Sequence, residues 1–136
     1  MLPRLLSCRR GVVSVEAAIV FPVLIALALG MMEFGLMIFT FSSMQTAARE
    51  VTRQLSVNFT TQAAAEAAVR ARLPAWSADA ADVVVAQTAP GSPEINVISV
   101  EVTMPAADAT PVTFFTNMAD AWTLRTEVIM KQELPL

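Results

Sequence analysis

The sequence has 136 residues, of which 55% are hydrophobic and only 15% are charged, and its formal net charge is −3. It has no His and a single Cys, which excludes imidazole catalysis, an internal disulfide and a His- or Cys-based zinc site, so we expect no metal and no cofactor. The negative net charge and the absence of a basic run argue against a nucleic-acid-binding protein.

The first eleven residues are basic. They contain Arg4, Arg9 and Arg10 and no acidic residue, and a long apolar segment follows them directly. The positive-inside rule places such a flank in the cytoplasm. We therefore expect a cytoplasmic N-terminus and a periplasmic C-terminal region in a bacterial inner-membrane protein.

The apolar segment predicts one long helix over residues 12–57. Between residues 11 and 48 the only charged residues are Glu16 and Glu33. A bilayer core needs about 20 helical residues, so the sequence predicts a single transmembrane segment at about residues 17–40. Pro22 predicts a kink, while Gly30 and Gly35 are candidate packing or interface positions whose spacing differs from GxxxG.

The two acids within this apolar helix are candidates for function. Sixteen residues, or about 24 Å of helix, separate Glu16 from Glu33, whereas the hydrocarbon layer is about 30 Å thick. At least one carboxylate is then drawn into apolar surroundings, which costs on the order of 3 kcal/mol at a helix centre. Glu33 has a second interpretation, because its side chain can reach the outer interface.

A partner for Glu16 appears if the chain is cut after Gly11. Val12 then carries a new α-ammonium group, one helical turn before Glu16. The two charges can pair within one subunit or between subunits that are offset along the helix axis, and either pairing offsets the cost of burial. The alternative is that Glu16 is an interfacial acid whose side chain extends to water.

These residues resemble the cleavage region of type IV pilin-like precursors, and they resemble TadE-like proteins of the tight-adherence (Tad, or Flp) pilus most closely. In such precursors a peptidase cuts after the glycine and leaves glutamate as the fifth mature residue. The resemblance rests on residues 9–18, on Phe21-Pro22 with the aliphatic run that follows, on residues 30–35 and on residues 45–53.

The resemblance implies a minor pilin or pseudopilin with a prepilin leader at residues 1–11, which a TadV-like prepilin peptidase removes. It also implies partnership with other Tad pilins and pseudopilins, an inner-membrane assembly platform and membrane lipid, with Glu16 needed for processing or docking. Ala17 stands where major Flp pilins often carry an aromatic residue, and the chain is too long for a major pilin. The alternative is an uncleaved single-pass accessory subunit that anchors a periplasmic interaction domain.

Residues 58–136 predict a small α+β domain beyond the helix. Residues 61–73 are rich in Ala and predict a short helix whose apolar edge is Ala65, Val69 and Leu73. Three strands are predicted, from residue 83, at residues 98–104 and at residues 124–130, and together they form an antiparallel sheet.

The predicted loop at residues 105–122 contains three aromatic residues that we expect to anchor the core, namely Phe114, Phe115 and Trp122. The acids of this domain are scattered singly and show no metal-binding loop spacing. No catalytic constellation is recognisable, and we therefore expect a structural protein rather than an enzyme.

Overall fold

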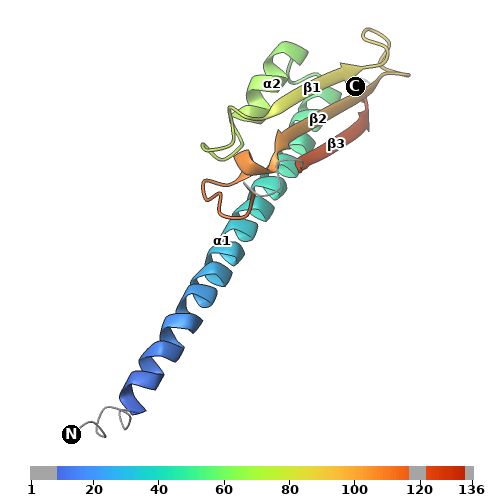
Figure 1. The fold of residues 1–136 in the computed structure, drawn as a ribbon. Coiled ribbons are helices and arrows are strands. Elements are labelled where there is room, and N and C mark those ends of the chain that lie inside the picture. The colour runs from blue at the N-terminus through green and yellow to red at the C-terminus, as the bar shows by residue number, and fades with distance from the viewer. Residues whose placement is uncertain (1–8, 117–121, 134–136) are drawn as a thin grey trace, which may run out of the picture.

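The computed structural model describes residues 9–116 and 122–133 of the chain, so most of the predicted leader, residues 1–8, lies outside the described residues. A long helix passes into a small domain in which a sheet, a second helix and a short 3-10 helix pack together (Figure 1). In chain order the elements are α1 (Arg9–Ser56), α2 (Gln62–Arg70), β1 (Asp82–Gln87), β2 (Val97–Pro105), η2 (Ala106–Ala109) and β3 (Thr123–Lys131).

Helix α1 is continuous over 48 residues, or about 72 Å, as the apolar sequence predicted. It begins at Arg9, three residues before the predicted start, and it continues through Pro22. Proline lacks an amide hydrogen, so the helix loses one backbone bond there and continues on the remaining ones. Asn58 follows the helix with a φ of 58°. Asparagine tolerates this left-handed conformation, which ends many helices.

The domain has two layers, a three-stranded sheet and two helices on one of its faces. The strand order is β1-β2-β3 and both pairs are antiparallel, so the predicted α+β fold class is confirmed. Helix α1 lies against β2 and β3, and α2 lies against β1 and α1 (Figure 1). The lower half of α1 extends away from the domain.

Alternation along the strands produces the apolar face of the sheet. In β2 every second residue is buried, from Ile98 to Met104. The register places Val100 opposite Val85 on one side and Val128 on the other, so these side chains face the helices together. Each strand begins one residue before its predicted start, and β2 and β3 also end one residue after their predicted ends.

The upper part of α1 supplies much of the core. Met44, Ala48, Val51 and Leu55 are buried at the helical spacing that the sequence showed. Helix α2 adds Ala65 and Val69 of the predicted apolar edge. Leu73 is buried too, but it lies beyond the end of α2, which stops at Arg70 rather than at residue 73. Thr61 caps α2 by accepting a hydrogen bond from the amide of Ala64. The small sheet is thus covered by an amphipathic section of a helix that is apolar all round further down.

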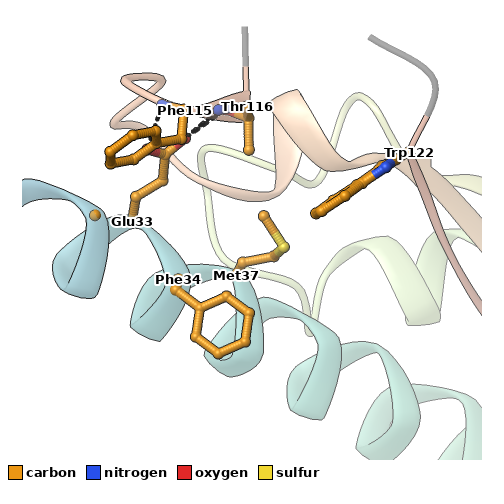
Figure 2. A pocket seen from close by; sticks show the side chains of 7 residues that line it. Glu33, Phe34, Met37, Phe115, Thr116 and Trp122 are labelled. Atoms are coloured by element: carbon orange, nitrogen blue, oxygen red, sulfur yellow. Dashed lines mark hydrogen bonds between the residues drawn. The ribbon is translucent and has the colours of Figure 1, made fainter. Parts of the chain in front are cut away.

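The expectation that three loop aromatics anchor the core is wrong. Phe114 and Phe115 are 47% and 46% exposed, and Trp122 is 63% exposed. The core consists instead of aliphatic side chains and methionines from the strands and helices, with Phe41 of α1 packed against it. Phe115 and Trp122 lie beside α1 instead (Figure 2), and the ring of Phe114 packs against that of Phe115.

Candidate functional site

The first candidate site is the lower half of α1, at residues 13–32. No side chain in this stretch is buried, although nearly all of them are apolar. Ile19, Phe21 and Met31, for example, are each more than 60% exposed. Among the described residues, one helix is long and apolar enough to cross a membrane, and this stretch belongs to it. Its surface needs an apolar environment that residues 9–116 and 122–133 do not provide.

Glu16 is an exposed side chain on this stretch, and no other charged residue lies between residues 13 and 32. Gly11 and Val12, the residues of the predicted cleavage site, lie in the backbone of the first turns of α1. The predicted pairing of Glu16 with a new amino terminus at Val12 concerns a cut chain, and it stays a prediction.

Glu33 marks the upper end of the exposed stretch and is only 2% exposed. Its carboxylate accepts four hydrogen bonds from the segment that follows η2. Oε2 accepts from the amides of Phe114 and Phe115 at 3.1 and 2.7 Å, and Oε1 accepts from the amide and the hydroxyl of Thr116 at 2.7 and 2.6 Å. Three consecutive amides directed at one carboxylate form an anion-binding concavity.

Other contacts hold the loop beside α1. The hydroxyl of Thr40 donates to the carbonyl of Ala109 at 2.6 Å, and the indole Nε1–H of Trp76 donates to the same carbonyl at 3.3 Å. Ala109 is the last residue of η2, which follows β2 directly. Its bonded carbonyl therefore fixes the start of the segment that leads to residues 114–116 and Glu33. The loop is therefore attached to α1 at two levels.

The two glycines singled out in the sequence differ in their surroundings. A Cβ atom on Gly30 would lie 2.6 Å from Cε2 of Phe115, so the ring of Phe115 lies directly on this glycine. No heavy atom comes within 4 Å of a Cβ atom built on Gly35. Gly30 thus packs against the chain's own loop, and Gly35 is open to the surroundings.

A pocket of about 220 Å³ lies between α1 and the loop. In Figure 2 the side chain of Glu33 points from α1 to the loop segment of Phe115 and Thr116, while Phe34 points to the other side of the helix. Met37 projects between the helix and Trp122. The lining is almost entirely apolar, and the polar groups of Glu33 and Thr116 bond to each other. The pocket therefore offers mainly apolar contact.

Sequence reasoning found Glu33 but missed its partners. The amides that bind it belong to residues 81 to 83 positions later, in a loop without periodicity. Thr40 was missed as well, although a hydroxyl between Phe39 and Phe41 in an apolar run is a signal of internal bonding. The roles predicted for Gly11, Glu16, Pro22 and Gly35 stay predictions.

The comparisons with known proteins bear on the same helix. The family model described as TadE-like protein matches residues 11–53. No curated protein and no solved structure matches the chain. The matched residues include the exposed stretch, Glu16, Glu33 and most of the section of α1 that enters the core. Over residues 11–53 the chain is therefore similar to TadE-like proteins, as its sequence motifs indicated.

Proposed function

We propose that this chain is a TadE-like minor pilin or pseudopilin, which a TadV-like prepilin peptidase cuts between Gly11 and Val12. Its precursor crosses the inner membrane once, with its N-terminus in the cytoplasm and its domain in the periplasm. The mature chain acts in the assembly of an adhesive Tad pilus, together with other Tad pilins and the assembly platform. The role is structural and requires no cofactor.

One observation carries the proposal, namely an apolar helical surface at residues 13–32, none of whose side chains is buried by the described part of the chain. In the bilayer, lipid covers residues 13–32. If the chain leaves the bilayer, the same surface must pack against other apolar helices, because its exposure to water is unfavourable. Glu16 would then need a cationic partner in the packed helices, and the amino terminus freed at Val12 provides one.

A second function, an uncleaved single-pass accessory subunit, is supported by the bonds of Glu33. They fix the domain at the end of the apolar stretch, which is what a membrane anchor for a periplasmic interaction domain requires. The two functions differ in the fate of the first eleven residues.

Co-expression of the full chain with a prepilin peptidase separates the two functions. The pilin proposal predicts an intact mass that lacks residues 1–11. It also predicts that Gly11→Ala is processed better than variants with a bulky residue, and that Gly11→Leu stays full length, because a large side chain does not fit where the peptidase accepts glycine. A wild-type chain that stays full length beside an active peptidase would favour the accessory subunit. Normal cutting of Gly11→Leu would contradict the assigned site.

A further inference from the structure

Six exposed aromatic side chains surround α1 where it enters the domain, and we name them the aromatic collar. We propose that the collar lies in the headgroup layer of the bilayer and holds the base of the domain on the membrane surface. This inference rests on the membrane insertion that the proposed function includes. The collar consists of Phe34, Phe39, Trp76, Phe114, Phe115 and Trp122.

The length of the uncovered helix sets the level of the membrane. Residues 13–32 give about 30 Å of helix, which equals the thickness of the hydrocarbon layer. The next residue, Glu33, is the first to be buried by the domain. The structure thus favours a span at residues 13–32, several residues before the segment that hydropathy alone suggested. Glu16 then lies about one turn from the inner boundary, within reach of water.

The collar begins where this span ends. Phe115 lies on Gly30, in the last turn of the uncovered helix, and Phe114 packs edge-on against it with ring centroids 4.8 Å apart. Trp122 lines the pocket with Met37, and Trp76 contacts Phe39 with ring centroids 6.3 Å apart. On α1 the collar extends from Phe34 to Phe39, or about 8 Å, which is comparable to the roughly 5–8 Å of one headgroup layer.

The chemistry of the collar suits an interface between lipid and water. The chain has nine aromatic residues, seven Phe and two Trp, and six of them, including both Trp, lie in the collar. Tryptophan is enriched at this level in membrane proteins because its large ring is apolar and its N–H is polar. Phe115 lies on Gly30, with Phe114 against it, at the hydrocarbon boundary of the proposed span. Trp122 lies beside Met37 and Trp76 beside Phe39, further along α1 toward the domain.

The charge distribution indicates that lipid, rather than an oppositely charged protein surface, covers the collar. Neither α1 from residue 34 to residue 48 nor the loop from residue 109 to residue 116 contains a charged residue. A zwitterionic lipid surface therefore suffices, with no need for anionic lipid. By contrast, Phe59 is 81% exposed just beyond the far end of α1, and serves as an internal control. That end, Ser56, lies roughly 25 Å along the helix from Phe39.

Depth-dependent quenching of tryptophan fluorescence tests the proposal on the full chain in phosphatidylcholine vesicles. Trp76→Phe leaves Trp122 as the reporter, and Trp122→Phe leaves Trp76. The control carries both of these substitutions together with Phe59→Trp. Each protein is measured in lipid brominated near the glycerol end of the chains, in lipid brominated near the chain ends and in unbrominated lipid. Flotation of the vesicles shows independently whether the chain is inserted.

The collar predicts that emission at positions 76 and 122 is blue-shifted and is quenched more by bromine near the glycerol than by bromine at the chain ends. The reporter introduced at position 59 is not quenched by either lipid. If the chain floats with the vesicles but the collar tryptophans are not quenched, the proposed position of the collar is wrong and membrane insertion still stands. Water or a second copy of the chain would then cover the collar. Equal quenching at position 59 would also overturn it, and a chain that does not float would contradict membrane insertion itself.

Discussion

At the scale of single residues, Glu33 shows how an acid is accommodated in an apolar helix. Its carboxylate is buried, and the cost of removing it from water is offset by four hydrogen bonds from one short loop segment. Bonds to a charged acceptor are stronger than neutral ones, and here three of the donors are backbone amides that the fold fixes in place. Glu33 therefore joins α1 to the loop, whereas Glu16 stays exposed.

We predict that Glu33→Ala releases the loop. The substitution removes both acceptor oxygens and with them all four hydrogen bonds. We expect the free energy of unfolding to fall by on the order of 3 kcal/mol, because the donors, among them the buried amide of Thr116, lose these acceptors. Hydrogen exchange of the amides of Phe114, Phe115 and Thr116 in detergent micelles reports the release directly.

The matched control is Glu50→Ala, on the exposed face of the same helix. Glu50 accepts a single side-chain bond from Gln54, so its loss should leave loop exchange unchanged. Equal exchange rates in the Glu33→Ala protein and the wild type would show that the carboxylate does not hold the loop.

The sequence alone predicted that Glu33 needed compensation, but it did not reveal the donors. An isolated acid in an apolar helix is readable from composition, since its cost follows from the surroundings. The donors are backbone amides of a loop more than 80 positions away, and every residue except proline carries such an amide. No side-chain pattern in residues 114–116 distinguishes them, so only the folded chain shows the contact.

At the scale of elements, α1 serves two environments with one continuous helix. Its lower half is apolar on all sides, and its upper half has one apolar face that enters the core. The sequence predicted the buried face of the upper half, because apolar residues three and four positions apart lie on one side of a helix. It predicted the strands in the same way, because alternate residues of a strand lie on one face of a sheet. The prediction that the loop aromatics lie in the core was wrong. It assumed that large aromatic side chains are buried away from water inside the domain, whereas Phe114, Phe115 and Trp122 lie at its surface.

The two glycines of α1 give a prediction at this scale. Gly30→Ala places a methyl group where the ring of Phe115 lies, so the ring must shift and the loop should lose about 1 kcal/mol of packing. Gly35→Ala meets open space and should leave the loop unchanged while strengthening the helix slightly. Limited proteolysis of the loop compares the two variants. Equal cleavage rates would contradict the assigned packing of Phe115 on Gly30.

At the scale of the whole molecule, a folded domain is attached near one end of a helix whose other end is uncovered (Figure 1). No side chain of residues 13–29 is buried by the domain, so that stretch can exchange lipid for other helices without unfolding the sheet. A folded domain at one end of α1 and an unburied apolar stretch at the other fit the proposed subunit that moves from the membrane into a fibre. This arrangement also makes Glu16, the charged side chain on the uncovered stretch, the residue most sensitive to the change of environment.

We predict that Glu16→Ala impairs pilus assembly more than membrane insertion. Insertion should be kept or slightly improved, because a charge is removed from the apolar stretch. Assembly should fall, because the amino terminus at Val12 loses its partner in the packed helices. Counting surface pili and measuring the membrane-bound fraction in the same cells separates these effects. Glu66→Ala, an exposed acid on α2, is the control, and normal pilus numbers without the Glu16 carboxylate would refute the pairing.

The most direct test of the whole account is N-terminal sequencing of the chain taken from cells with working Tad pilus machinery. The account predicts a sequence that begins at Val12, with Glu16 as the fifth residue. A sequence that begins at Met1 would contradict it, because the cationic residues before Gly11 would then keep the helix anchored in the membrane and Glu16 would lack the amino group that offsets its burial.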